Sequence, residues 1–290
     1  MTKTLGVIGG GVLGRAVARG FLEHLEVKVF DTIKERATHS LEEAATCDIV
    51  MICLPTPAKL DGRCDTKAID DFLDVAFTHE WWRPDSCYVI RSTTPVGYTQ
   101  DQAHSTDFER PLLHSPESLT ARCALTDFQI PARNIIGMPG KGHWMPASPV
   151  IYEAFKRLKS VYENRFPGVP VLDMDARESE LVKLACNSFF AAKVTLFNLF
   201  AEMAKAKDLD WETVRAGILS DGRIAHAHTA VPGPSGERGY AGSCLDKDLA
   251  DLYRCCEDAA VDAEILRQVL ERNKLTRSEA GLKTAEISLF

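Results

Sequence analysis

The sequence lacks the features that mark several large classes of protein. It has no excess of basic residues, because the 290-residue chain carries a formal net charge of −7, whereas a general nucleic-acid binder normally presents a basic face. Its apolar runs are too short to span a bilayer, and it contains no internal repeat or low-complexity tract. We therefore expect no nucleic-acid or membrane partner, while an anionic small-molecule substrate remains compatible with a local basic pocket.

The nine cysteines form no CxxC pair and no His/Cys spacing typical of a metal site. Their odd number does not indicate a disulfide framework. The N-terminal segment MTKTLGVIGGGVLG runs directly into an apolar strand and resembles no cleavable signal. We expect a reducing, cytoplasmic environment and no bound metal.

What the sequence does contain is an ordinary globular composition and a regular alternation of strands and helices. Hydrophobic residues make up 45% and charged residues 26% of the chain, which is typical of a soluble protein of two domains. The pattern predicts strands at 4–8, 27–30, 48–54, 88–91, 112–114, 134–137 and 169–173, and helices at 12–25, 66–79 and 147–164. This alternation indicates an α/β fold with a Rossmann-type doubly wound parallel sheet.

The pattern changes to helices alone after Asp175. Residues 177–207 contain no Pro or Gly and have apolar residues at helical spacing, which predicts one long helix. A Gly- and Pro-rich loop (231–243) precedes helical stretches over 245–272. We therefore divide the chain into a sheet domain at 1–175, a smaller all-helical domain at 176–277, and a polar C-terminal tail at 278–290 that we expect to be loosely ordered.

A glycine-rich turn joins the first predicted strand to the first predicted helix. In Gly9-x-Gly11-x-x-Gly14, the first glycine permits a tight turn, the second lets the backbone approach a pyrophosphate, and the third lets helix and strand pack closely. The N–H groups at the start of the helix, at Val12 and Leu13, would then face the phosphates of a dinucleotide.

Asp31 ends the second predicted strand, where a carboxylate can accept hydrogen bonds from the ribose diol of the cofactor. A carboxylate at this position repels a 2′-phosphate, which favours NAD over NADP. A glycine turn that merely lets a helix pack against a strand does not account for Asp31. A GxGxxG motif alone is a weak signal, but with strand, helix and acidic residue all in place it predicts a NAD-binding domain.

Several further segments match one family in their order and spacing. They are LPTP (54–57), RSTTPVG (91–97), SPESL (115–119), DFQIPARNIIG (127–137), ESELVKLACNSFFAAKVTLFN (178–198), SDGRI (220–224) and GYAGSCLDKDL (239–249). Together with the glycine turn they resemble the UDP-glucose/GDP-mannose dehydrogenases, over residues 4 to about 273. That family oxidises a primary alcohol of a sugar nucleotide to a carboxylate with two NAD. The resemblance implies the same four-electron oxidation here, with a nucleotide sugar such as UDP-glucose as substrate.

The resemblance also implies roles for individual residues. Cys244 matches the family's nucleophile, and Lys183 and Asn187 match its helix pair. The other matching catalytic positions are Asp248 of the KD after the cysteine, Glu117 of the PE, and Thr93 of the STxP segment, which helps to hold a catalytic water. The implied cofactor contacts beyond the glycine turn are Thr56, near the nicotinamide, Thr93 and Lys247.

These residue types suit the implied chemistry. Lys183 and Asn187 are one turn apart on a predicted helix, so an ammonium and an amide share one face and can stabilise a developing oxyanion. Taken alone, that pair is more often a solvated lysine and a surface asparagine. Cys244 lies after a glycine loop and at the start of a predicted helix, where the dipole and nearby Lys247 favour the thiolate. Asp246 acts in the opposite direction.

The implied mechanism has two oxidations. Asp248, through a water positioned with Lys183, accepts the alcohol proton of the substrate in the first. Cys244 then adds to the aldehyde to give a thiohemiacetal, and its oxidation gives a thioester. Hydrolysis to the carboxylate is assisted by Glu117 or by a water held by Thr93 and Asp248.

The chain departs from the family at three places. PEFLREG becomes PESLTAR, FGGSCFPKD becomes YAGSCLDKD, and the sequence ends where a third, nucleotide-binding domain of the family begins. Two other readings therefore stay open. One is a two-electron hydroxyacid-type dehydrogenase, which also has Lys-x-x-x-Asn on a helical domain. The other is a truncated, non-catalytic NAD-binding relative.

Two further expectations concern partners and substrate. The family dimerises through the helix that matches 177–207, so the resemblance implies a homodimer. Four basic residues flank the glycine loop and could meet substrate phosphates, although solvated loop residues are equally common: Arg223, His226, His228 and Arg238.

Overall fold

The computed structural model describes residues 2–79, 81, 85–104, 110–140, 148–241, 244–284, 286–287 and 289. The chain divides into two compact units. Unit 1 comprises Met1–Thr56 and Asp65–Lys183, and unit 2 comprises Pro57–Cys64 and Leu184–Phe290. Six predicted positions lie outside the described residues: Ala147 at the start of a helix, Gly242 and Ser243 in the glycine loop, and Ala285, Ser288 and Phe290 in the tail.

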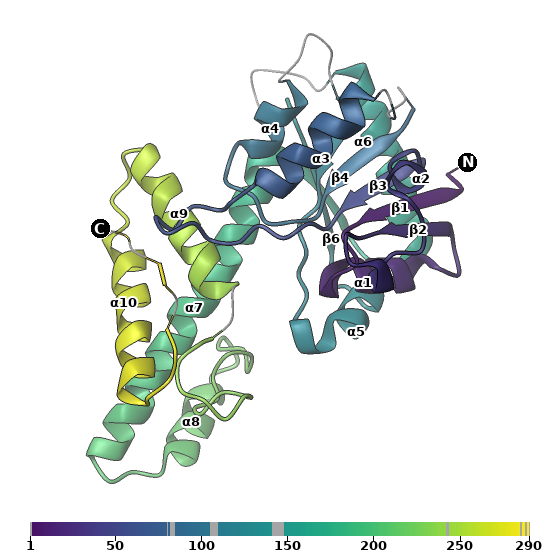
Figure 1. Ribbon diagram of the computed structural model, residues 1–290. Helices are drawn as coiled ribbons and strands as arrows, with labels where there is room; N and C mark the ends of the chain where they lie inside the picture. The colour runs from purple at the N-terminus through teal and green to yellow at the C-terminus, as the bar shows by residue number, and fades with distance from the viewer. Residues whose placement is uncertain are drawn as a thin grey trace. The chain divides into compact units, whose positions relative to one another are not determined.

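Unit 1 is built on one seven-stranded sheet (Figure 1). The strands are β1 (Thr4–Ile8), β2 (Glu26–Phe30), β3 (Ile49–Ile52), β4 (Cys87–Ile90), β5 (Leu112–His114), β6 (Asn134–Met138) and β7 (Val171–Asp175). Their order is β2-β1-β3-β4-β5-β6-β7, and every neighbouring pair is parallel except β5 and β6. The predicted α/β fold is confirmed, and the antiparallel β5–β6 pairing was not predicted.

Helices cover both faces of this sheet. Figure 1 shows α3 (Lys67–Thr78) and α4 (Tyr98–Ala103) on the opposite side of the sheet from α1 (Val12–Phe21) and α5 (Ala124–Gln129). Right-handed crossover connections place these helices on opposite faces, because the chain moves along the sheet in one direction from β1 to β2 and in the opposite direction from β3 to β4. The change of direction lies between β1 and β3, where open α/β sheets bind ligands beyond the carboxyl ends of their strands.

Burial on both sides explains the composition of the central strands. All four residues of β3, Ile-Val-Met-Ile, have no exposed surface, and the four of β4 have none either. Continuous apolar runs of this kind fit a parallel sheet with helices on both faces. The helix α6 (Pro149–Arg165) contributes Ile151, Phe155, Leu158 and Tyr162 to the same core.

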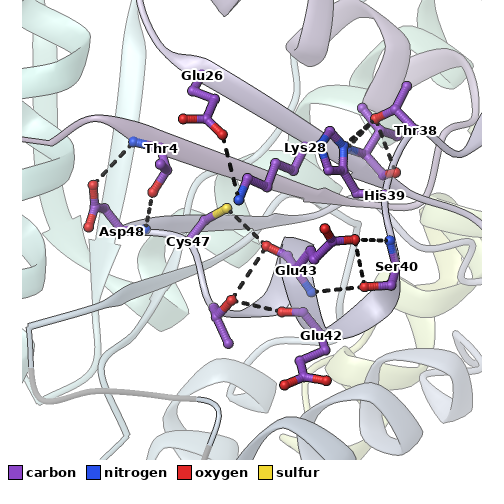
Figure 2. Close-up of polar contacts among 12 residues, drawn as sticks. Thr4, Glu26, Lys28, Thr38, His39, Ser40, Glu42, Glu43, Cys47 and Asp48 are labelled. Carbon is purple, nitrogen blue, oxygen red and sulfur yellow. Dashed lines mark hydrogen bonds and ion pairs between the residues drawn. The ribbon is translucent and has the colours of Figure 1, made fainter.

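A short helix, α2 (Leu41–Ala45), joins β2 to β3 and was not predicted. Figure 2 shows its capping box, in which the Glu43 N–H donates to Ser40 Oγ at 3.2 Å and the Ser40 N–H donates to Glu43 Oε2 at 2.8 Å. The same view shows how the next residues return to the sheet, since the Asp48 N–H donates to Thr4 Oγ1 at 2.9 Å and Asp48 Oδ2 accepts from the Thr4 N–H. Side-chain hydrogen bonds therefore set the start of β3 beside β1.

Unit 2 is helical. Its elements are most of α7 (Ala176–Ala206), α8 (Trp211–Leu219), α9 (Leu245–Asp258) and α10 (Glu264–Glu279). The predicted long helix at 177–207 is therefore confirmed to within one residue at each end, and the predicted helical region at 245–272 consists of two helices. Segment 57–64 also belongs to unit 2, because the Arg63 guanidinium pairs with Asp258 at 2.6 Å and the Cys64 N–H donates to Asp251 Oδ1 at 2.8 Å.

The helix α7 is long and apolar enough to cross a membrane by length and composition, with an 18-residue window of mean hydropathy 1.3 of which 28% is buried. Length and composition alone are weak evidence for a membrane span, so the expectation of no membrane partner stays a prediction. It relied on uninterrupted apolar runs, whereas isolated polar residues interrupt the apolar face of α7. Core and interface helices of soluble proteins meet the same criterion.

The expectation of a loosely ordered polar end is also wrong for two residues. Ile287 and Leu289 are 7% and 6% exposed and belong to the apolar core of unit 2 with Leu249, Ala250 and Leu270. The Lys274 ammonium donates to the Ile287 carbonyl at 2.5 Å, which fixes the backbone there. Burial of these two apolar side chains orders this part of the chain, although the surrounding residues are mostly polar.

Candidate active site

The glycine turn leaves β1 and starts α1 as the motif predicts. Gly9 has φ of +101°, which favours glycine, and a Cβ there would lie 2.6 Å from the Cys53 carbonyl oxygen. A Cβ on Gly14 would lie 1.8 Å from the Gly9 carbonyl oxygen, so this glycine permits the close helix–strand contact. A Cβ on Gly11 would meet no protein atom within 4 Å.

The environment of Gly11 fits a bound dinucleotide. Packing within the chain does not require a glycine at this position, and Gly11 is the N-cap of α1 without a side-chain cap. The first N–H groups of the helix, at Val12 and Leu13, lie in the turn that follows and have no side-chain acceptor from Gly11. A helix N-terminus with free N–H groups and open space in front of it can accept a pyrophosphate.

Asp31 lies one residue beyond the end of β2, beside this turn. Its Oδ2 accepts a hydrogen bond from the Gly10 N–H at 2.7 Å, and its Oδ1 accepts one from the Ile33 N–H at 2.7 Å. The carboxylate is therefore fixed against the glycine turn and remains half-exposed. Each carboxylate oxygen has a further lone pair that a ribose diol could use.

Two threonines predicted to contact the cofactor, Thr56 near the nicotinamide and Thr93, lie together in unit 1. The Thr56 hydroxyl donates to the Thr93 carbonyl oxygen at 2.9 Å, and the Ser92 hydroxyl donates to the Leu54 carbonyl oxygen at 2.6 Å. These bonds join the segment after β3 to the segment after β4. Both segments lie at the carboxyl ends of parallel strands, so they meet at one edge of the sheet.

Glu117 and Lys183 form a buried ion pair in unit 1. The Lys183 ammonium lies 2.5 Å from Glu117 Oε1, and the Leu119 N–H donates to Glu117 Oε2 at 2.9 Å. Burial acts to raise the pKa of Glu117, but the Lys183 charge and these hydrogen bonds outweigh it, and the pKa lies below its ordinary value. The sequence motifs placed both residues at the site and did not predict that they pair.

Glu180 is a buried site residue that the sequence reasoning missed. It has no exposed surface and accepts hydrogen bonds from the Gly97 N–H at 2.6 Å and from the Thr99 N–H and hydroxyl at 2.8 and 2.6 Å, with Thr94 at 3.2 Å. Burial raises the pKa of Glu180 to about 7, although these donors act against the shift. Glu180 thus ties the STTPVG segment, next to Thr93, to the helix that carries Lys183.

In unit 2, Asn187 contacts the start of α9. The Asn187 side-chain amide donates to Asp248 Oδ2 at 2.5 Å, and Asp248 is almost fully buried. The Lys247 ammonium pairs with Asp248 Oδ1, also at 2.5 Å. The structure therefore brings three of the predicted site residues into one hydrogen-bonded set, which we call the Asp248 cluster: Asn187, Lys247 and Asp248.

Lys247 has a second partner that the sequence did not predict. Its ammonium lies 3.3 Å from the Cys64 sulfur, and the Cys64 N–H donates to Asp251 Oδ1. Burial acts to lower the pKa of Lys247, but Asp248 and Cys64 outweigh it and the pKa lies above its ordinary value. Burial raises the pKa of the Cys64 thiol to about 12, against the opposing charge of Lys247.

Cys244 is the N-cap residue of α9 and is exposed. The Asp248 N–H donates to the Cys244 carbonyl oxygen at 2.9 Å, so the thiol-bearing residue lies one helical turn from the Asp248 cluster. Asp246, between them in sequence, is 5% exposed, and its carboxylate lies 3.5 Å from the Asn273 amide of α10. Burial raises the pKa of Asp246 to about 6.

The four basic residues near the glycine loop have partners of their own. Arg223 pairs with Asp221 at 2.6 Å and Arg238 pairs with Glu202 at 2.6 Å. The His228 ring stacks on Phe190 with centroids 4.4 Å apart, and the His226 carbonyl accepts from the Thr229 hydroxyl. A substrate phosphate would have to displace the two carboxylates. Within the described ranges, no group of three His, Cys, Asp or Glu side chains is placed to hold a metal ion.

Comparison with known proteins identifies both parts of the chain. Residues 7–163 match the NAD binding domain of the UDP-glucose/GDP-mannose dehydrogenase family, and residues 177–275 match the family's central domain. The first match confirms NAD as the predicted cofactor. Relatives include the UDP-glucose 6-dehydrogenases of Pseudomonas aeruginosa, 31% identical over 263 residues, and of Rickettsia conorii, 30% identical over 248 residues.

Solved structures give the same picture of the fold. A UDP-glucose dehydrogenase from Pyrobaculum islandicum superposes with a TM-score of 0.79 and 26% identity, over 97% of this chain and 70% of that one. The 3-hydroxyisobutyrate dehydrogenase of Mycobacterium tuberculosis, at 17% identity and a TM-score of 0.70, shares the fold over 100% of this chain and 97% of its own.

The matches to the curated relatives cover 87% of this chain and 54% of the Pseudomonas aeruginosa protein, and 84% and 53% for the Rickettsia conorii protein. The chain thus spans about half the length of these relatives. The two family matches together cover the sheet domain and most of the helical one. The chain belongs to the UDP-glucose/GDP-mannose dehydrogenase family.

Proposed function

We propose that the chain is a NAD-dependent dehydrogenase that oxidises the primary alcohol of a nucleotide sugar to the carboxylate in two steps. The observation that carries the proposal is the Asp248 cluster. A buried carboxylate, held by an amide and an ammonium, lies one helical turn from an exposed cysteine. Two further expectations belong to this proposal. One is the division of the chain into domains at 1–175, 176–277 and 278–290. The other is a reducing cytoplasmic environment, which agrees with the nine cysteines all being free thiols.

Bound NAD would accept one hydride from the reacting carbon in each oxidation. In the first, Asp248 takes the alcohol proton through a water, and the carbon becomes an aldehyde. The thiolate of Cys244 then forms a carbon–sulfur bond to the aldehyde, and the resulting oxyanion takes up a proton. Loss of that proton and of the second hydride from the thiohemiacetal leaves a thioester on Cys244.

Hydrolysis completes the sequence. A water attacks the thioester carbon, and the carbon–sulfur bond breaks to release the carboxylate and the thiol. Thr93, Asp248 and Glu117 are the residues proposed for holding or activating this water. One water is consumed and two hydrides leave the substrate carbon. The Lys183 ammonium and the Asn187 amide stabilise the oxyanions of both addition steps, and removal of one such donor typically costs about 100- to 1,000-fold in rate.

A hydroxyacid-type dehydrogenase remains the second candidate. The shared fold of 3-hydroxyisobutyrate dehydrogenase, covering almost all of both chains, favours it. Lys183 and Asn187 would serve a two-electron oxidation as well as a four-electron one. Cys244 has no role in that reaction, so the cysteine discriminates between the candidates.

The test is product analysis with wild type, Cys244→Ala and Cys123→Ala. Cys123 is the matched control, because it is also exposed but lies in unit 1 outside the proposed site. UDP-glucose, GDP-mannose and 3-hydroxyisobutyrate are offered with NAD. We expect carboxylate from a sugar nucleotide with wild type and Cys123→Ala, and a loss of about 100-fold or more in carboxylate formation with Cys244→Ala.

Three outcomes would contradict the proposal. If Cys244→Ala forms carboxylate at the wild-type rate, the cysteine is not the nucleophile. If 3-hydroxyisobutyrate is the substrate that turns over, the two-electron candidate holds. If NAD binds and nothing turns over, the chain is a non-catalytic relative.

We further propose that the chain forms a homodimer through α7. Apolar side chains of this helix are exposed at helical spacing on one stripe, which we call the α7 stripe: Phe189, Leu196, Leu199, Phe200 and Met203, between 39% and 64% exposed. A contiguous apolar stripe of this kind on a soluble protein is typical of an interface. A second copy of the same helix would bury it.

A further inference from the structure

A cavity of about 320 Å³ lies between the exposed face of α1 and the segment that leads into α5. Three arginines line it, Arg15 and Arg19 of α1 and Arg122 before α5, and we call it the arginine groove. Figure 1 shows α1 and α5 on the same side of the sheet. The rings of Phe21 in α1 and Phe128 in α5 pack edge to face with centroids 5.7 Å apart, which holds the two walls of the groove together.

The three arginine side chains are exposed, so a ligand in the groove can reach them. On α1, Arg15 and Arg19 are four residues apart and share one face with Val12, which is 50% exposed. The opposite face of the helix, with Val17 and Phe21, has no exposed surface and belongs to the core of unit 1. The guanidiniums are therefore on the side of α1 that the core leaves free.

The charges of these guanidiniums are not balanced within the chain. In the part of the chain that the structure describes, none of the three forms an ion pair, and the groove is lined by no acidic residue. By contrast Arg223, whose side chain is 90% exposed, still pairs with Asp221 at 2.6 Å. Like charges four residues apart also destabilise a helix. Three unpaired guanidiniums around one cavity, in a chain of net charge −7, indicate a site for an anion.

The third arginine is a departure of this chain from the family motif. Where the family has PEFLREG, this chain has PESLTAR at 116–122, so Arg122 takes the place of a glycine and the glutamate before it is an alanine. The last three residues change from Arg-Glu-Gly, with no net charge, to Thr-Ala-Arg, with one positive charge. This segment therefore gains a guanidinium at the groove and loses a neighbouring carboxylate.

We propose that the arginine groove binds a small phosphate-bearing anion other than NAD. A guanidinium donates two parallel N–H groups to phosphate oxygens, which suits it to this class of ligand. Arg122 contacts the phosphate groups from one wall, and Arg15 and Arg19 contact them from the other. The volume of the groove is at the lower end of the range of small-molecule sites, which fits a diphosphate or a small nucleotide.

The groove extends beyond the expected position of the cofactor pyrophosphate. Val12 lines one end of it, at the start of α1. At a rise of about 1.5 Å per residue, Arg19 lies about 10 Å further along the helix axis. A pyrophosphate at the first N–H groups of α1 therefore leaves most of the groove free for a second anion. The proposal rests on the groove alone and does not depend on dehydrogenase activity.

Isothermal titration calorimetry of the NAD-saturated protein tests the proposal with three probes: inorganic pyrophosphate, ADP and uncharged adenosine. The buffer contains no divalent cation and has constant ionic strength. Saturating NAD keeps the probes out of the glycine turn. We expect saturable binding of pyrophosphate, of ADP or of both, and none of adenosine. Tighter binding of ADP identifies a nucleotide as the ligand, tighter binding of pyrophosphate identifies the phosphate groups alone, and either result supports the site.

Variants assign the binding to the groove. Arg19→Ala and Arg122→Ala each remove one guanidinium, and loss of a charge-assisted hydrogen bond corresponds to a Kd about tenfold weaker or more. Arg122→Lys keeps the charge without the paired N–H groups, so its Kd should lie between those of wild type and Arg122→Ala. Both arginines are exposed, so the Tm of the variants should stay close to that of wild type.

The matched control is Arg157→Ala, which removes the same charge from α6 of the same unit, away from the groove, and should leave the Kd unchanged. The proposal is overturned if neither anion binds saturably to the NAD-saturated protein, or if adenosine binds as tightly as ADP. It is equally overturned if folded Arg19→Ala and Arg122→Ala proteins bind the anions as tightly as wild type.

Discussion

Buried charges in this chain are held in two different ways. Lys183 pairs with Glu117, and Lys247 pairs with Asp248, so an opposite charge offsets the cost of removing each from water. Glu180 has no cation partner among the described residues and is held by backbone and hydroxyl donors instead. In the first arrangement an ammonium and a carboxylate compensate each other's charge, and in the second burial raises the pKa of Glu180 to about 7, so its charge is sensitive to pH.

Lys183→Met should destabilise the fold as well as impair catalysis. The substitution leaves the Glu117 carboxylate buried without its partner, which typically costs about 3–5 kcal/mol. Urea unfolding at pH 7 measures the free energy of unfolding. The matched control is Lys156→Met, an exposed lysine of α6 that pairs with exposed Glu153 and should change little. The double variant Lys183→Met/Glu117→Gln should recover part of the lost free energy of unfolding. An equal loss in the single and the double variant would contradict the pairing.

The raised pKa of Glu180 predicts a pH dependence of stability. Because the pKa is about 7 in the fold and 4.5 in the unfolded chain, the folded state binds the proton more tightly. The contribution of Glu180 to the free energy of unfolding is therefore fully present below about pH 4.5 and is lost as the pH rises through 7. The Tm of wild type and of Glu180→Gln is measured from pH 5 to pH 8. The difference by which the wild-type Tm exceeds that of the variant should shrink as the pH rises. An advantage that grows with pH would show that the four donors keep the carboxylate ionised.

The sequence predicted some residues of this proposed site and gave no role to others, for a physical reason. Lys183, Asn187, Cys244 and Asp248 lie in motifs whose spacing and residue types match a family. Cys64 lies outside any such motif, and Glu180 lies in the matching segment 178–198 without an assigned role, because the contacts of both residues come from burial and from partners far away in sequence. Nothing in a single sequence distinguishes Glu180 from a solvated glutamate on a helix.

At the scale of elements, the strand–turn–helix unit at the N-terminus separates two roles of glycine. Gly14 is required by packing within the chain, whereas Gly11 borders open space. Gly11→Ala should therefore leave the Tm nearly unchanged, because its φ of −70° suits alanine. The same change should weaken NAD binding about tenfold or more, since a methyl group would enter the space of the pyrophosphate.

Fluorescence titration with NAD and a thermal melt check this prediction together. Gly217→Ala is the matched control, because a Cβ there also meets no atom and the residue lies in α8 of unit 2. A Gly11→Ala protein that binds NAD as tightly as wild type would contradict the assigned role of the turn.

The α7 stripe carries the prediction of a dimer. Leu196→Glu and Phe200→Glu place charges at the centre of the stripe, and burying an unpaired charge in an interface is costly. Sedimentation equilibrium should give a dimer for wild type and a monomer for the variants. Ile265→Glu, at a residue of α10 that is 74% exposed, should remain dimeric. A wild-type monomer at all concentrations, or dimeric stripe variants, would contradict the proposal.

Long elements with a regular pattern were predictable, and short ones were not. The single long helix α7 and all seven strands appear at the predicted places, with ends that differ by a few residues. The missed helices α2, α4, α5 and α8 are five to nine residues long, too short for an apolar period to develop. They depend on local caps, such as Ser40 on α2 and Asp210 on α8, and on contacts distant in sequence.

At the scale of the whole molecule, sequence order does not coincide with the compact units. The predicted division falls at 175, where β7 ends, but the first turns of α7 belong to unit 1 through Ser179, Glu180 and Lys183. Segment 57–64 belongs to unit 2 although it lies between two strands of unit 1. Ion pairs and backbone hydrogen bonds to α9 hold segment 57–64 in unit 2. No change of composition in the sequence marks the ends of this segment.

The number of NADH molecules formed for each substrate molecule consumed tests the central claim most directly. The full chain is incubated with limiting UDP-glucose or GDP-mannose and excess NAD, and absorbance gives NADH while chromatography gives substrate and product. If Cys244 carries the aldehyde to the acid, two NADH should appear for each substrate molecule, with the carboxylate as the sole product. One NADH for each molecule, with an aldehyde or ketone as product, would contradict the account.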